Sequence, residues 1–159
     1  MQRQIEMVRE FHNHIHALMR EQPQPLDCEK SEEKRVATEL RQVLGTCQQL
    51  TRDPDDLMAR LALSIEELAE WVESHVHAQG EDRPEICELL DSWADRAYTL
   101  YGDAVATEIA HVATEIFAEV HRSNMSKTKA SKNELGKGKK GDEFQSPRLS
   151  QFFDAPTDG

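Results

Sequence analysis

Three glutamates within five residues are the first feature of this sequence that could do chemistry: Glu66, Glu67 and Glu70. Side chains three and four positions apart lie one turn apart on the same side of an α-helix, so these carboxylates are expected to share one patch. Without a cation they repel one another. A second acidic series follows at intervals of three and four residues, comprising Glu88, Asp91 and Asp95.

Two acidic series on neighbouring helices can face each other across a bundle, which is how helical bundles build metal sites from carboxylate oxygens. Such a site suits Mg²⁺, and also Mn²⁺, because these hard cations prefer oxygen ligands and bridge to phosphates. The alternative is a solvated acidic face opposite the apolar stripe that runs from Leu61 to Val72. Ala59 and Leu63 extend the acidic side toward the start of the helix, which indicates that the helix is contacted on both sides.

The elements that must position these residues are expected to be helices throughout. Apolar residues recur at helical spacing, and Gly and Pro are sparse before residue 127. We expect helices at about 2–21, 28–50, 55–77 and from about 85 to 127, with a turn at Gly80–Pro84. No Gly or Pro marks the break in the last stretch, so the fold is all-α with four to five helices.

The apolar stripes predict which faces of these helices are buried. In the 28–50 helix the stripe of Val36, Leu40, Val43 and Leu44 should face inward. The helix that begins near residue 85 is apolar over half its circumference and should be buried on a wide face, which includes Leu90, Trp93 and Tyr101.

Composition changes after Ser126, which predicts one domain over 1–126 and a tail over 127–159 that is first basic and then hydrophobic. The tail's Gly136–Gly141 stretch lacks the Gly-Lys-Ser/Thr ending of a phosphate-binding loop. We expect a flexible segment that folds back on the acidic face.

Charge and cysteine content narrow the function classes. The formal net charge is −11, with 30 Asp+Glu against 19 Lys+Arg, which argues against nucleic acid as the main partner. The three cysteines have none of the paired spacings that hold zinc and fit a reducing compartment. The first residues alternate charged and apolar side chains, which predicts neither a signal peptide nor a membrane span, so we expect a cytoplasmic protein with no membrane partner.

Ordered motifs carry a resemblance to a known superfamily. The segments Ile65–Trp71, Trp93–Gly102 and Phe117–Lys127 follow one another as they do in the MazG-like and phosphoribosyl-ATP pyrophosphohydrolase superfamily, and Val8–His12 also fits. The chain therefore resembles that superfamily over the first helix and from about residue 58 to 150. The 28–50 helix has no match.

The resemblance implies a MazG-like bundle, usually completed by dimerisation, that cleaves a nucleoside triphosphate to the monophosphate and pyrophosphate. It implies that Glu67, Glu70 and Asp95 ligate Mg²⁺ and that Glu66 positions or deprotonates the attacking water. dUTP or another (d)NTP is the expected substrate class, and a homodimer is the expected assembly.

One position departs from the superfamily's second motif, Glu-x-x-Asp. Alignment on Asp95 puts Ser92 where the glutamate belongs, while a literal Glu-x-x-Asp lies one turn earlier, at Glu88 and Asp91. Asp91, Glu88 or water could replace the ligand. Ser92→Glu is expected to tighten Mg²⁺ binding, and unchanged affinity would show that one of these already fills the place. The alternative is a catalytically impaired nucleotide-binding or protein-interaction module.

The last helix of the predicted domain carries the residues expected to contact the substrate: Asn124, Lys127 and Arg122. The resemblance implies that this segment binds the nucleotide or its phosphates, and cations are natural phosphate partners in an acidic protein. The alternative is a polar helix end whose cations interact with the helix dipole. His12, His14 and His16 lack the Glu or Cys that would complete a metal motif.

The C-terminal segment Ser146–Phe153 resembles the peptide by which partners dock on sliding clamps, although Ser146 replaces its leading Gln. A hydrophobic tail that packs back on the domain or on its dimer mate is the favoured interpretation.

Overall fold

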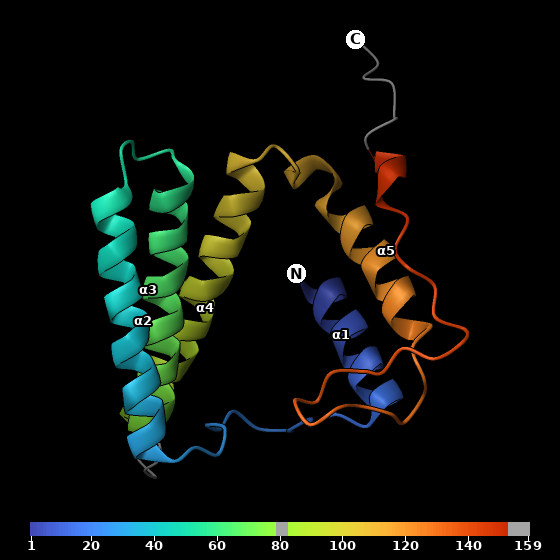
Figure 1. The fold of residues 1–159 in the computed structure, drawn as a ribbon. Coiled ribbons are helices and arrows are strands. Elements are labelled where there is room, and N and C mark those ends of the chain that lie inside the picture. The colour runs from blue at the N-terminus through green and yellow to red at the C-terminus, as the bar shows by residue number, and fades with distance from the viewer. Residues whose placement is uncertain (79–82, 153–159) are drawn as a thin grey trace. The chain divides into compact units, whose positions relative to one another are not determined.

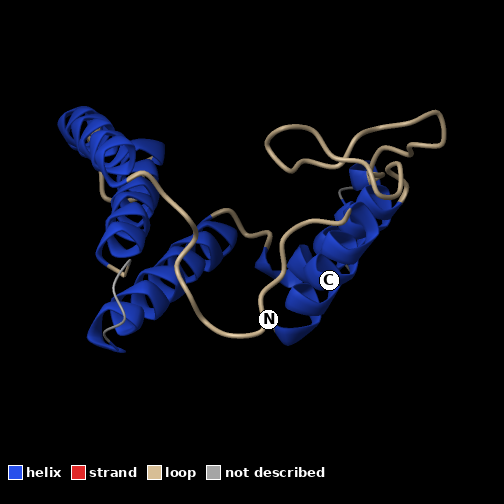
Figure 2. Cartoon of the chain, turned by 90° about the horizontal axis from the view of Figure 1, so that it is seen from below, coloured by secondary structure: helices blue, strands red, loops and turns tan. Residues whose placement is uncertain are grey.

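The computed structural model describes residues 1–78 and 83–152 of the 159-residue chain. Helices α1 to α5 and two short 3₁₀ helices form the fold, and these ranges contain no β-strand (Figures 1 and 2). The bounds are α1 Gln2–Ile15, α2 Lys30–Leu50, α3 Leu57–His77, α4 Arg83–Ala106, η1 Ala110–Val112, α5 Ala113–Met125 and η2 Leu149–Phe152. The prediction of an all-α helical bundle is confirmed. The beginning of the predicted turn at Gly80–Pro84 lies outside the described residues.

The chain folds as two compact units. Unit 2 is continuous and covers Gln22–Glu108, and unit 1 combines Met1–Glu21 with Ile109–Gly159. The predicted limits of a single domain, 1–126, stay a prediction, because one domain can contain two compact units.

Unit 2 is built on α3, which packs against α2 on one side and against α4 on another (Figure 1). Asp56 caps the first turn of α3, where its carboxylate accepts the N–H of Ala59 at 2.8 Å. The core between α2 and α3 contains Leu44, Cys47, Ala62 and Ile65, with Leu40 against them.

Two residues of the expected stripe on α2 are not in this core. Val36 and Val43 are 42% and 48% exposed. The buried line of α2 runs instead through Ala37, Leu44 and Cys47. The helix is therefore rotated relative to the prediction, because small side chains let α2 approach α3 closely.

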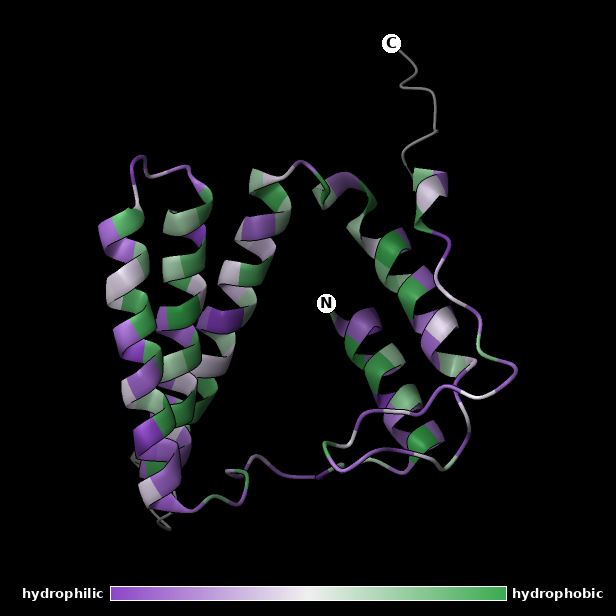
Figure 3. Cartoon of the chain, in the orientation of Figure 1, coloured by the Kyte–Doolittle hydropathy of each residue, from purple (hydrophilic) through white to green (hydrophobic). Residues whose placement is uncertain are grey.

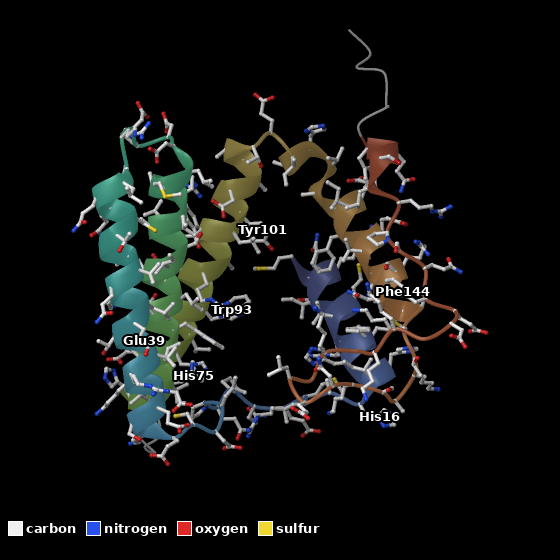
Figure 4. The ribbon with its side chains drawn as sticks, in the orientation of Figure 1. His16, Glu39, His75, Trp93, Tyr101 and Phe144 are labelled. Carbon is white, nitrogen blue, oxygen red and sulfur yellow. The ribbon has the colours of Figure 1, made fainter. Side chains whose placement is uncertain are left out.

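The wide apolar face of α4 is exposed, contrary to the prediction. Leu89 is buried, but Leu90, Trp93 and Tyr101 are 49%, 46% and 48% exposed. Within unit 2, α4 packs on α3 alone, so only a narrow strip of α4 is covered. Figure 3 shows hydrophobic residues along α4, and Figure 4 shows Trp93 and Tyr101 extending from this helix.

An ion pair fixes the far end of the α3–α4 contact. The guanidinium of Arg60 lies 2.8 Å from the carboxylate of Asp103 and donates to the carbonyl of Thr99 at 3.1 Å. A Cβ atom at Gly102 would come within 2.6 Å of the guanidinium, so glycine at this position leaves room for the arginine.

In unit 1, α1 packs against α5. Helix α1 ends at Ile15, six residues before the predicted end, because His16 takes a left-handed conformation with φ 56°. The tail uses the carbonyl groups at this end of the helix. Ala130 donates its N–H to the carbonyl of His14 at 2.7 Å, and Lys132 donates to the carbonyl of His16.

The break that no Gly or Pro marks lies after Ala106. The hydroxyl of Thr107 donates to the carbonyl of Asp103 at 2.7 Å, and Glu108 has a positive φ of 58°. Residues with a short polar side chain that bonds the preceding turn commonly end helices.

The basic start of the tail is a hydrogen-bonded loop in unit 1, not the flexible segment that we expected. The backbone N–H of Thr128 donates to the carbonyl of Lys139 at 3.0 Å, and the N–H of Lys139 donates to the carbonyl of Ser131 at 3.1 Å. Lys132 and Gly138 form an isolated β-bridge. A Cβ atom at Gly138 would lie 2.9 Å from the ring of Phe11, so this glycine permits the loop to lie on α1.

The hydrophobic end of the tail returns to α5. The short helix η2 packs against α5, as expected for a tail that packs back. It includes Leu149 and Phe152 of the clamp-like peptide, whereas Phe153 lies outside the described residues. Among the helices described, none is long and apolar enough to cross a membrane.

Candidate functional site

Two small polar residues meet at the contact between α3 and α4. The hydroxyls of Ser74 and Ser92 are 2.8 Å apart, and Ser92 also donates to the carbonyl of Leu89 at 3.1 Å. Both serines are buried. Small side chains at this point bring the helices close together, so the longer side chains around them gather at one pocket.

This α3–α4 pocket has a volume of about 290 Å³ and is strongly acidic. Its lining includes carboxylates from both helices and one arginine from α2. The lining residues are Arg41, Glu70, Glu73, Ser74, His77, Glu88, Asp91, Ser92 and Asp95.

The structure brings together most of the predicted metal ligands. Glu70, Asp91 and Asp95 line the pocket, and Glu67 is close enough to Glu70 and Asp95 to feel their charges. Glu66 does not line the pocket, although its charge also acts on Glu67. The two acidic series therefore meet at the pocket, through Glu70 on α3 and through Glu88, Asp91 and Asp95 on α4.

Glu67 shows the cost of this arrangement. Burial raises the pKa of its carboxyl group, and the charges of Glu70, Asp95 and Glu66 raise it further. Its Oε2 atom is buried and has no hydrogen-bond partner among the described residues. A buried carboxylate oxygen without a partner is costly, and a bound cation would satisfy it.

Arg41 is a pocket residue that the sequence analysis missed. Its Nη2 and Nε atoms lie 2.8 and 3.3 Å from the two carboxylate oxygens of Glu73, and Nη2 lies 3.6 Å from Glu70. The pairing with Glu73 raises the pKa of Arg41, which stays charged. Arg41 is four residues after Ala37 and three before Leu44, so it borders the buried line of α2, which the predicted stripe did not give correctly.

The pocket fits a hard divalent cation in the chemistry of its donors, which are carboxylate oxygens. Glu67, with its unpartnered Oε2 atom, lies near Glu70 and Asp95 but does not line the pocket. In the described ranges, no group of three or more His, Cys, Asp or Glu side chains is gathered closely enough to hold a metal ion. The side chains of the pocket would have to turn toward a metal.

Arg122, in α5 of unit 1, is engaged within its own unit. Its guanidinium binds both oxygens of Glu119 at 2.8 and 2.9 Å and reaches the tail at Gln145 and Ser146. The backbone N–H of Arg148 also donates to Glu119 at 2.7 Å. These bonds lower the pKa of Glu119 to about 2, so Arg122 and Glu119 hold the tail on α5.

Lys127 lies in a different environment from Arg122. Its ammonium is 5.2 Å from the centre of the Phe11 ring and borders a pocket of about 960 Å³ in unit 1. Burial lowers the pKa of Lys127, and the charges of Lys137 and Lys140 lower it further. Neighbouring cations around a half-buried ammonium favour an anion. Asn124 does not line this pocket, and its carbonyl accepts the N–H of Lys127 at 3.1 Å.

The histidines and aromatic residues have local partners. His12 and His14 bond two different carbonyls, those of Leu18 and Lys127, and His121 pairs with Glu10 at 3.1 Å. On α3, Trp71 lies between His75, at its edge, and the guanidinium of Arg96, 4.3 Å from the ring centre.

Comparison of the chain with protein-family models, with curated protein sequences and with solved structures finds no match. The resemblance to the MazG-like superfamily therefore rests on the sequence motifs themselves.

Proposed function

We propose that the α3–α4 pocket binds Mg²⁺ and that the protein is a MazG-like nucleoside triphosphate pyrophosphohydrolase. One observation carries the proposal: carboxylates of two facing helices line one pocket beside Glu67, whose Oε2 atom is buried without a partner. Without a cation, clustered carboxylates lower the stability of the folded protein, and a divalent cation would relieve that repulsion.

In this proposal Glu67, Glu70, Asp91 and Asp95 hold the metal, with Mn²⁺ as a possible substitute. A divalent cation supplies positive charge for the phosphate oxygens that become more negative when the anhydride bond breaks. Glu66, whose charge acts on the cluster, orients or deprotonates the attacking water.

The structure suggests how the motif departure at Ser92 is accommodated. Ser92 makes the close contact with Ser74, while Glu88 and Asp91 line the same pocket from the preceding turn. We propose that this literal Glu-x-x-Asp supplies the ligand expected at position 92.

Lys127 is proposed to bind the substrate's phosphates, with Asn124 next to it. Arg122 supports this region by holding the tail on α5. A (d)NTP, with dUTP as one member, is the proposed substrate, and a homodimer is the proposed assembly.

A pyrophosphate-release assay with a panel of NTPs and dNTPs in Mg²⁺ tests the activity. Turnover of at least one nucleotide to its monophosphate is expected. Glu67→Gln and Asp95→Asn should each lower the rate by about a hundredfold or more. Glu115→Gln, an exposed carboxylate change on α5, is the matched control and should keep the activity. Equal turnover by all four proteins would place the chemistry elsewhere.

The exposed apolar residues of α4 favour a second candidate, a catalytically impaired interaction module. Leu90, Trp93 and Tyr101 are each nearly half exposed, and such faces commonly mark protein interfaces. The same panel separates the candidates, because this module would bind Mg²⁺ without releasing pyrophosphate from any nucleotide. Docking of Ser146–Phe153 on a sliding clamp stays a prediction.

A further inference from the structure

Arg41 contacts two carboxylates of the acidic pocket at unequal distances. It holds Glu73 with two hydrogen bonds of 2.8 and 3.3 Å, whereas its distance to Glu70 is 3.6 Å. The first contact has the paired geometry that arginine makes with carboxylates, and the second is a looser attraction. Glu73 therefore anchors the guanidinium, and Glu70 is the partner that it can lose.

Arg41 is also the only Lys or Arg among the described residues that line the pocket. Five carboxylates line it as well, and His77 lies 3.5 Å from one of them, Glu88. The guanidinium thus supplies the positive charge that the cluster needs when no other cation is present. It competes with a metal for Glu70.

The Arg41 side chain has enough freedom and enough N–H donors to bind a ligand as well as to neutralise the carboxylates of the pocket. Arg41, Glu70 and Glu73 are 35%, 44% and 37% exposed, so the group lies at the mouth of the pocket. A guanidinium has five N–H groups in a planar fork that matches phosphate oxygens. Arg41 can keep a bond to Glu73 and still offer donors to a phosphate.

We infer that Arg41 is an internal counter-cation of the metal-free pocket that yields Glu70 to Mg²⁺ and then binds a phosphate group of the nucleotide. The inference rests on the proposed function. It gives α2, the helix that the sequence motifs do not cover, a role in binding substrate.

The inference predicts opposite effects of one substitution. In Arg41→Gln the competing charge is gone, so the Kd for Mg²⁺ without nucleotide should fall about two- to fivefold, the range expected for a partly exposed ion pair. The KM for the nucleotide should rise about fivefold or more, with a smaller change in kcat, because a ground-state phosphate contact is lost.

Two further variants control for charge and for folding. Arg35→Gln removes a cation from the same helix, where Arg35 pairs only loosely, at 3.9 Å, with Glu39, and both constants should stay within about twofold of the wild type. Arg41→Lys keeps the competing charge but loses the fork, so the Kd for Mg²⁺ should stay near the wild-type value while KM still rises. Thermal melts establish that each variant is folded.

Calorimetric titration with Mg²⁺ separates failure of this inference from failure of the proposed function. If the wild type binds no Mg²⁺, the proposed function falls and the role of Arg41 falls with it. If the wild type binds Mg²⁺ but Arg41→Gln binds it no more tightly than Arg35→Gln does, only the counter-cation role is wrong. An unchanged KM in Arg41→Gln would overturn the phosphate contact.

Discussion

The two units of this protein use glutamate in opposite ways. Glu119 in unit 1 accepts bonds from Arg122 and from the backbone of Arg148, and its pKa is lowered to about 2. Glu67 in unit 2 is surrounded by Glu66, Glu70 and Asp95, and its pKa is raised. The same side chain is thus stabilised as an anion in one unit and destabilised in the other.

The difference reflects the cations that each helix provides. Glu119 has Arg122 three residues later, on the same side of α5. In α3 the only Lys or Arg is Arg60, which pairs with Asp103. Paired carboxylates fasten a local structure, whereas clustered ones cost stability and leave a capacity to bind a cation. The pair of Glu119 and Arg122 therefore stabilises unit 1 locally, whereas the cluster around Glu67 is left with an excess of negative charge.

The largest expected effect comes from adding a carboxylate to unit 2. Ser92→Glu puts a charged side chain at a buried helix contact and breaks the hydroxyl pair with Ser74. We expect a loss of about 2–4 kcal/mol in the free energy of unfolding without metal, measured by denaturant titration. Ser92→Ala loses only the hydrogen bond and should cost about 1 kcal/mol.

Ser92→Glu also tests which residue replaces the missing glutamate of the Glu-x-x-Asp motif. If Glu88 and Asp91 already supply the ligand, saturating Mg²⁺ will not restore the stability that Ser92→Glu loses. Full recovery in Mg²⁺, with tighter binding than in the wild type, would show instead that position 92 is the ligand position and that the proposed role of Glu88 is wrong.

The helices of unit 2 could be predicted closely from sequence, and those of unit 1 less well. Periodicity gave α2 and α3 to within a few residues. The end of α1 depends on His16 and on bonds from Ala130 and Lys132, more than a hundred residues away in the chain. Periodicity reports local packing and cannot detect such contacts. The same limit explains why the loop after Lys127 was expected to be flexible.

The acidic side of the candidate site was predictable, and its basic side was not. The spacing of Glu67, Glu70 and Asp95 contains the information that they share a face. Arg41 reaches them from another helix, and only tertiary packing shows which of the cations on α2 does so. The exposure of Trp93 and Tyr101 was also missed, because an apolar helix face does not reveal how much of it its neighbours cover.

The second prediction is that Mg²⁺ acts through unit 2. At a concentration of 100 times its Kd, Mg²⁺ should raise the free energy of unfolding by about 2.7 kcal/mol. The gain should be lost in Glu67→Gln and retained in Glu119→Gln, because only the first carboxylate belongs to the cluster. Thermal melts with and without Mg²⁺ measure it. Equal gains in both variants would mean that the metal binds elsewhere.

A third, smaller effect is expected when the pairing in unit 1 is removed. Glu119→Gln loses the ion pair with Arg122 and weakens the bond to the backbone of Arg148, so the tail should leave α5 more often. A protease specific for Lys and Arg should then cut after Arg148 about three to ten times faster, since cleavage tracks the open population. Glu115→Gln, on the same helix, should leave the rate unchanged. An unchanged rate in Glu119→Gln would show that the tail is held by other contacts.

The smallest expected effect is that acid changes the stability contributions of Glu119 in unit 1 and Glu67 in unit 2 in opposite directions. Glu119 has a lower pKa in the folded protein, about 2, than its ordinary value of 4.5, so its contribution to stability is present above pH 4.5 and is lost as the pH falls toward 2. Glu67 has the opposite sign, because its raised pKa means that protonation relieves repulsion in the folded state. The melting temperature of Glu119→Gln should therefore lie below that of the wild type at pH 6 and approach it near pH 2.5. The change is small because a single ion pair at the surface contributes little to stability. A constant difference across this range would show that Glu119 stabilises the tail through its shape and neutral hydrogen bonds, and the contrast between the two glutamates would then lie in packing and not in charge.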